Sequence, residues 1–235
     1  MSTITEVVEF AESKRPGIKA GLIPATMQDV ERYSVLSQGV IPQQYLEMLR
    51  LMGMSCGELE IAHAVFDIQQ LNARYNVLAP QLDKRYALVA IDCGEMYLDY
   101  YIDRAEGDLY DAPVVRFDYE VDDPEIFAMY GSLYEWLYSV IFKRFALEQH
   151  KHIIEKVIST EKDQELLTTL CGSLASLGFV SPLDDTPLLC AACRSHASVI
   201  VRQHPTDEFV VLGIGADDQR EMNEIHEVLM KEIGL

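Results

Sequence analysis

The order of the predicted elements places this chain in the α+β class. Three strand-like stretches, 86–92, 96–103 and 114–121, follow one another with no helical pattern between them. A helix with a wide apolar face is then predicted over 132–146, where it would cover a sheet. From 163 onward the pattern runs helix, strands, helix. We therefore expect a helix-flanked sheet followed by a small α/β module.

The N-terminal part is predicted to be mainly helical. Apolar residues cluster near one side of a helix over 4–13, and a proline- and glycine-containing arm follows at 15–24. A second helix is expected over 26–37. Pro42 suits the first turn of a third helix, which Gly53 can end.

The middle of the chain is predicted to be rich in strands. Residues 57–66 have the alternation of a strand, and the polar stretch 67–84 is expected to form a loop with a short helix in it. Residues 86–92 are apolar enough for a central strand. In 114–121, alternation directs Val115, Phe117, Tyr119 and Val121 inward, and Arg116, Asp118 and Glu120 outward.

The C-terminal part is predicted as a separate module. Residues 147–162 are expected either to extend the preceding helix or to form a hinge after it. A helix over 163–179, three strands over 188–194, 197–203 and 208–215, and a helix over 217–234 follow. The predicted organisation is an N-terminal helix and arm (1–24), a main domain (25–147) and the module (148–235).

The stretch MYLDYYID, 96–103, is the most distinctive predicted strand. Met96, Leu98, Tyr100 and Ile102 form an ordinary core face, whereas tyrosine and aspartate alternate on the other face. Tyrosine is enriched in binding hot spots, and carboxylates attract basic partners. We interpret this second face, continued by the next strand, as an exposed acidic and aromatic partner-binding face: Tyr97, Asp99, Tyr101, Asp103, Asp118 and Glu120. The alternative is that a helix or the C-terminal module covers it.

The charge distribution points to the same region. The formal net charge is −19, and residues 91–135 contain 13 acidic and 2 basic residues, a net of −11. Such a surface repels nucleic acid and anionic membrane, and it favours a basic protein partner. The plainer alternative is that the surplus carboxylates only increase solubility.

Three features of the sequence indicate the expected location. The chain has no run of about 18 apolar residues, and its start lacks the basic and apolar regions of a secretory signal. Its five cysteines show no spacing typical of a disulfide framework. We expect a cytoplasmic protein.

The order of several motifs resembles the SMI1/KNR4 family, also called the SUKH superfamily. The motifs are IPQQYLEML (41–49), GELEI (57–61), ALVAID (87–92), MYLDYYID (96–103), VVRFDYEV (114–121) and YGSLYEWL (130–137). The resemblance covers about 25–147. It implies an α+β domain with a curved, mostly antiparallel sheet that serves in binding. Many bacterial members resemble immunity proteins that neutralise a toxin, often a nuclease or deaminase, and a fungal branch is linked to cell-wall regulation. No catalytic residue carries over.

Four further stretches contain residues that could carry chemistry. CAACRSH, 190–196, offers Cys190, Cys193 and His196 for zinc, but on a strand the two cysteines face opposite ways. His150 and His152 are expected to be a solvated pair. EGDLYD, 106–111, lacks the pattern of a calcium loop. LGIGADD, 212–218, is expected to be a strand-to-helix turn capped by Asp217 or Asp218.

We therefore predict a non-enzymatic protein-binding module with no cofactor and no bound metal. The leading hypothesis is a bacterial immunity protein that occludes the active site of a basic toxin. The alternatives are a regulatory scaffold of the SMI1/KNR4 type, and a metal- or thiol-dependent enzyme that uses Cys190, Cys193 and His196. The sequence does not indicate an oligomeric state.

Overall fold

The chain divides into two compact units. The computed structural model describes residues 2–61, 63–78, 82–94, 98–119, 121, 124–159, 166–206 and 209–233. We call the part formed chiefly by residues 3–137 the N-terminal unit and the part formed chiefly by residues 138–235 the C-terminal unit. The division falls within a helix, earlier in the chain than the boundary expected after residue 147.

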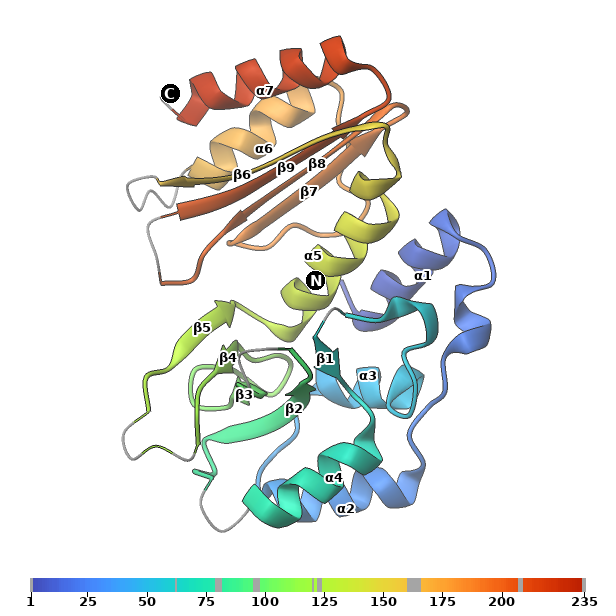
Figure 1. Cartoon of the computed structure of the whole chain (residues 1–235), viewed down its shortest axis with the longest axis vertical. Helices are drawn as coiled ribbons and strands as arrows, with labels where there is room; N and C mark the ends of the chain where they lie inside the picture. Colours follow the sequence, from blue (N-terminus) through green and yellow to red (C-terminus); the bar gives the residue numbers. More distant parts are fainter. Residues whose placement is uncertain are drawn as a thin grey trace. The chain divides into compact units, whose positions relative to one another are not determined.

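Both units combine helices with an antiparallel sheet, which confirms the α+β class (Figure 1). Up to the division, the elements are α1 (Ile4–Lys14), η1 (Ile18–Gly21), α2 (Met27–Ser37), α3 (Gln43–Met52), η2 (Gly57–Leu59), β1 (Ala64–Val65), α4 (Ile68–Leu78), β2 (Tyr86–Asp92), β3 (Tyr100–Asp103), β4 (Val114–Arg116), β5 (Phe127–Tyr130) and α5 (Leu133–Phe145). They are followed by η3 (Leu147–Gln149), β6 (His152–Ser159), α6 (Leu166–Ser176), β7 (Leu189–Arg194), β8 (Ala197–Gln203), β9 (Phe209–Ala216) and α7 (Gln219–Ile233).

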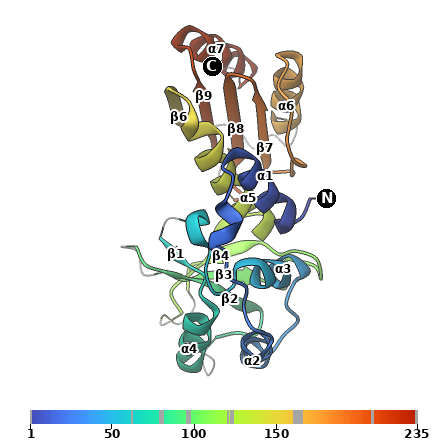
Figure 2. The ribbon, with the colours of Figure 1, turned by 90° about the vertical axis from the view of Figure 1, so that its right-hand side faces the viewer.

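One face of the N-terminal sheet is covered by α2 and α4. The sheet runs β1-β2-β3-β4-β5, and the two helices pack against each other beside it (Figures 1 and 2). The Tyr33 hydroxyl of α2 donates to the Leu88 carbonyl at 2.7 Å, and the Leu88 amide donates to the Tyr75 hydroxyl of α4 at 2.8 Å. Because both tyrosines are buried, these bonds fix the two helices on strand β2.

The opposite face of the same sheet is covered by the first turn of α5. The Trp136 ring stacks on the Tyr100 ring of β3 with centroids 4.6 Å apart, and it lies 5.2 Å from the Phe66 ring. The prediction that this helix covers the sheet is confirmed. Strands β3 and β4, and β2 as far as Ala90, are therefore buried on both faces, and their residues on either side are core residues.

The segment predicted as a strand over 57–66 is mostly not one. It contains the short helix η2 and the two-residue strand β1. Gly57 has φ of 52° and His63 has φ of 65°, both in the left-handed region. A continuous strand cannot include such residues, so the extended run is broken before β1 begins.

The strands predicted over 96–103 and 114–121 are shorter than expected. The described parts form β3 from Tyr100 and β4 only as far as Arg116. The alternation predicted for 114–121 ends with β4. Val121 is 52% exposed although it was expected to face inward, and Arg116 is 7% exposed although it was expected to face outward. Strand β5 was not predicted.

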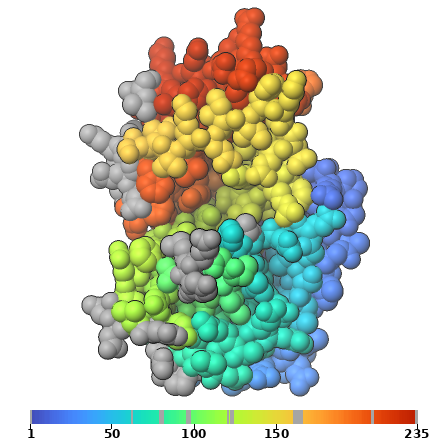
Figure 3. All heavy atoms as spheres, viewed as in Figure 1, coloured from blue at the N-terminus to red at the C-terminus, as the bar shows by residue number. Residues whose placement is uncertain are grey.

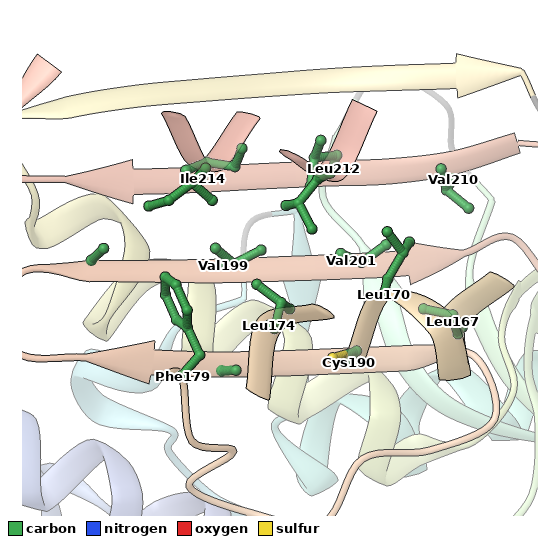
Figure 4. Packing of buried hydrophobic residues seen from close by; sticks show 14 of the residues in the cluster. Leu167, Leu170, Leu174, Phe179, Cys190, Val199, Val201, Val210, Leu212 and Ile214 are labelled. Carbon is green, nitrogen blue, oxygen red and sulfur yellow. The ribbon is translucent and has the colours of Figure 1, made fainter. Parts of the chain in front are cut away.

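The C-terminal unit packs two helices on one face of a four-stranded sheet. The strand order is β6-β9-β8-β7, and every neighbouring pair is antiparallel. Alternate residues of β8 and β9 meet apolar residues of α6 in one buried cluster (Figure 4). Labelled members include Leu170, Leu174, Val199, Leu212 and Ile214. The three predicted strands and both predicted helices are confirmed.

Strand β6 is the element of this unit that sequence analysis missed. All eight of its residues pair with β9, from His152 opposite Ala216 to Ser159 opposite Phe209. On the sheet face away from α6 and α7, η3 approaches two glycines of β9 closely. A Cβ placed on Gly215 would lie 2.5 Å from the Leu147 carbonyl oxygen. No helix in the described part of the chain is both long and apolar enough to cross a membrane.

Candidate functional site

The predicted acidic and aromatic face is buried at three of its six positions. Asp99, Tyr101 and Asp103 are 4%, 0% and 3% exposed, so the expectation that they face solvent is wrong. Asp118 is exposed, as predicted. The other two members, Tyr97 and Glu120, lie outside the described residues.

Helix α4 is the reason for this burial. Its Arg74 Nε donates to Asp99 Oδ2 at 3.0 Å, and the Asp92 amide donates to Asp99 Oδ1 at 3.0 Å. Asp99 therefore joins the helix to the sheet. The polar stretch expected to be mainly a loop is an eleven-residue helix, and it covers the face that was expected to be free.

The other two buried members also have structural partners. Arg85 contacts Asp103 in a two-pronged pair, with Nε to Oδ1 at 2.7 Å and an Nη to Oδ2 at 2.5 Å. Tyr101 stacks on Phe117 with centroids 4.4 Å apart, and burial raises the pKa of Tyr101 well above its ordinary value. These side chains have the surroundings of a core and not of a contact surface.

The burial also reduces the acidic surface predicted from the sequence. Five of the 13 acids in 91–135 have buried carboxylates: Asp92, Asp99, Asp103, Asp111 and Glu135. Among them, Asp111 is a cap for α5, because its oxygens accept the amides of Leu133 at 3.0 Å and Tyr134 at 3.1 Å. The region's net charge of −11 is therefore not a measure of charge on its surface.

Three exposed apolar residues lie on the segment that joins β4 to β5 or at the start of β5. Val121, Ile126 and Phe127 are 52%, 44% and 42% exposed. Asp118 and Glu125 of the same segment are exposed as well. We call these five residues the hairpin surface. β5 is the last strand of its sheet, and atoms of this hairpin reach the surface in yellow-green in the space-filling view (Figure 3).

The cysteines and histidine predicted as alternative zinc ligands do not come together. Cys190 and Cys193 face opposite sides of β7, as predicted, and Cys190 belongs to the buried cluster under α6. His196 is 70% exposed and lies 3.4 Å from Asp217. The structure instead places two residues that sequence analysis did not single out, Cys171 and Asp185, beside Cys190.

A histidine, an aspartate and a serine form a hydrogen-bonded chain in the C-terminal unit. His150 Nδ1 lies 2.9 Å from Asp217 Oδ1, and its Nε2 lies 3.0 Å from Ser198 Oγ. The same order of groups activates serine nucleophiles. Ser198 is, however, 3% exposed within the β8 ladder, where a substrate has no access. The chain joins η3, β8 and the start of α7, and the expectation of a solvated His150 is wrong because its side chain is 12% exposed.

Carboxylates in two further loops accept hydrogen bonds from the backbone. In 106–111, Asp108 accepts the amides of Tyr110 and Asp111 at 2.7 and 2.8 Å. At the start of α7, Asp218 accepts hydrogen bonds from the amides of Arg220 and Glu221 at 2.8 and 3.1 Å, so the cap is Asp218, one of the two residues predicted for this role. Both arrangements are those of turn and cap residues.

The chain matches no family model, no curated protein and no solved structure. Proposals about its function therefore rest on its own residues and on the motif resemblance described above.

Proposed function

We propose that this protein is a protein-binding module that holds a basic protein partner at the hairpin surface. The observation that carries the proposal is the adjacent pair Ile126 and Phe127, exposed at an edge strand and preceded by the exposed Glu125. Exposed apolar side chains bordered by charge are typical of interaction surfaces. An edge strand also offers backbone groups to a strand of a partner.

The charge of the chain supports a basic partner. The formal net charge of −19 favours encounter with positively charged proteins and disfavours nucleic acid. Within the hairpin surface, Asp118 and Glu125 would supply the acidic border and the apolar side chains would supply the buried centre. This arrangement, an apolar core with a charged rim, is the usual anatomy of a protein interface.

The finer proposal is that the partner is a toxin domain, as the resemblance to SMI1/KNR4 proteins implies. Occlusion of a basic active-site groove would then be the mechanism, with one protein bound per toxin. A regulatory scaffold is the alternative within the same class. A partner whose enzymatic activity is inhibited at a ratio of one to one supports the first, and a partner with no such activity supports the second.

The test begins with a partner that co-purifies in stoichiometric amount and is then produced separately. Titration calorimetry measures its binding to the wild-type chain and to a double variant, Ile126→Ser with Phe127→Ser. We expect at least tenfold weaker binding for this variant. Glu125→Lys should weaken binding mainly at low salt, because its effect is electrostatic.

The control is a matched pair of exposed valines outside the hairpin. Val35 of α2 and Val77 of α4 are 76% and 63% exposed. Val35→Ser with Val77→Ser removes similar apolar area and should bind like the wild type. If the control weakens binding as much as the hairpin variant does, the hairpin surface is not the contact and the proposal fails.

A further inference from the structure

Three metal-ligating side chains from distant parts of the sequence meet in the C-terminal unit. Cys171 lies on α6, Asp185 lies between α6 and β7, and Cys190 lies on β7. Their donor atoms are all within 4.8 Å of one another, and Cys171 Sγ is 4.0 Å from Asp185 Oδ2. Packing of α6 on β7 creates this cluster, which has no spacing motif in the sequence.

The three donor residues differ in their exposure to solvent. Cys190 is 1% exposed, and Figure 4 shows it on the helix-covered face of β7 near Leu167 and Leu170. Cys171 is half-buried, and Asp185 is exposed. One side of the cluster is therefore fixed in the core, while the other is open to an ion arriving from solvent.

The Asp185 carboxylate is held in place by two hydrogen bonds. The Ala191 amide donates to Oδ1 at 3.0 Å, and the Ser181 hydroxyl donates to Oδ2 at 2.9 Å. Such bonds orient metal-ligating carboxylates and are part of most metal sites.

Metals bind cysteine as the thiolate, so a divalent cation held by Cys171 and Cys190 would displace the proton of each thiol.

We propose that Cys171, Asp185 and Cys190 bind one thiophilic divalent cation of the zinc class. Zinc takes Cys sulfur at about 2.3 Å and carboxylate oxygen at about 2.0–2.2 Å in a tetrahedron, which brings sulfur and oxygen ligands to about 3.6 Å from each other. Only a small adjustment of the 4.0 Å separation is needed. Three protein ligands leave the fourth position to water. The ion would join α6 to β7, independently of any partner bound at the hairpin surface.

The test is a metal titration of the reduced, chelator-treated full chain. Cobalt(II) is the spectroscopic probe, because thiolate ligation gives intense charge-transfer absorption, and zinc(II) is then used to displace it. We expect one equivalent of cobalt to bind and zinc to displace it. Cys171→Ser and Asp185→Asn should each weaken binding by at least tenfold. Both changed side chains are at least partly exposed, so both variants should fold.

The matched control is Cys193→Ser, which removes a cysteine of the same strand that faces the other way. It should bind cobalt like the wild type. Zinc should also raise the unfolding temperature of the wild type and of Cys193→Ser, but not that of Cys171→Ser. Equal loss in Cys193→Ser would overturn the proposal. A reduced wild-type chain that binds no cobalt would also overturn it. Formation of a Cys171–Cys190 disulfide on treatment of that chain with peroxide would then indicate a redox pair in place of a metal site.

Discussion

An Nη atom of Arg116 lies 2.9 Å from Asp92 Oδ2, and the same guanidinium lies 4.3 Å from the centre of the Tyr100 ring. The side chains of the pair are 9% and 1% exposed. The contact is an ion pair and not an aligned hydrogen bond, and Arg116 Nε also donates to the Leu98 carbonyl at 2.8 Å. Arg116 thus joins β2, β3 and β4 through charge, ring contact and hydrogen bonding.

Loss of Arg116 should destabilise the N-terminal unit strongly. Arg116→Leu leaves the Asp92 carboxylate buried without its cation, and breaking such a pair costs about 3–5 kcal/mol. Urea unfolding followed by tryptophan fluorescence measures the change, because Trp136 stacks on Tyr100. Adding Asp92→Asn to Arg116→Leu should recover part of the loss. If the double variant is no more stable than the single one, the pair is not the source of the effect.

Charge reversal at the buried aspartates should unfold the N-terminal unit. Asp99→Lys with Asp103→Lys would place two cations against Arg74 and Arg85. The milder Asp103→Asn weakens a two-pronged charged pair, for which we expect a loss of about 1.5–3 kcal/mol. Circular dichroism during thermal unfolding measures the stability of the double lysine variant and of Asp103→Asn. Glu125→Lys, at an exposed position of the same unit, should change stability by about 0.5 kcal/mol or less. A folded, stable double lysine variant would contradict the burial of these residues.

The close approach of η3 to β9 should make Gly215→Ala destabilising. The added Cβ would lie 2.5 Å from the Leu147 carbonyl oxygen and 2.9 Å from His150 Cδ2. Overpacking of this kind costs about 1–3 kcal/mol. Gly172→Ala is the matched control, because no atom lies within 4 Å of its added Cβ on α6. It should stabilise the C-terminal unit by up to about 1 kcal/mol. Equal effects of the two changes would contradict this account.

Acid should weaken the C-terminal unit through Asp217. The hydrogen bond with His150, followed by that with His196, lowers the pKa of the Asp217 carboxyl. A group whose folded-state pKa is lowered adds stability above its unfolded pKa, about 3.9 for Asp. That contribution is lost as the pH falls through the folded value. The unfolding temperature should therefore decrease less steeply between pH 6 and about pH 3 for Asp217→Asn than for the wild type.

The control for this pH dependence is an exposed acid near the end of the same helix. Glu232→Gln on α7 should leave the acid side of the stability profile unchanged. A profile for Asp217→Asn that is parallel to the wild-type profile would show that His150 and His196 do not act on this carboxyl in the folded protein.

Short-range sequence patterns were sufficient to predict the elements whose structure depends little on distant parts of the chain. Strand β2 was predicted with its observed ends, because an apolar run bounded by charged residues has few alternatives. The cap of α7 followed from Asp218 before an amphipathic run. Helix α4 carried a usable signal, since Ile68, Leu71, Tyr75 and Leu78 are buried at helical spacing. The polar residues between them obscured it.

The remaining features depend on contacts that no local pattern reveals. HIIEKVIS suits a helix extension as well as a strand, and pairing with β9 decides in favour of β6. The alternation of tyrosine and aspartate in 96–103 shows only that the two faces of the segment differ. It does not show whether arginines such as Arg74 and Arg85 lie against the acidic one. The cluster at Cys190 likewise depends on the packing of α6.

The pairing of β6 with β9 also has a kinetic consequence. β7, β8 and β9 form a local meander, whereas β6 pairs with the strand that is last in the chain. Joining His152 to Ala216 closes a loop that contains the rest of the sheet and α6. Loop closure of this kind slows folding, because chain entropy is lost before the long-range contacts form. During synthesis on the ribosome, the hydrogen-bonding edge of β6 therefore stays unpaired until β9 has been synthesised. During that interval the unpaired edge of β6 is open to chaperones and to aggregation.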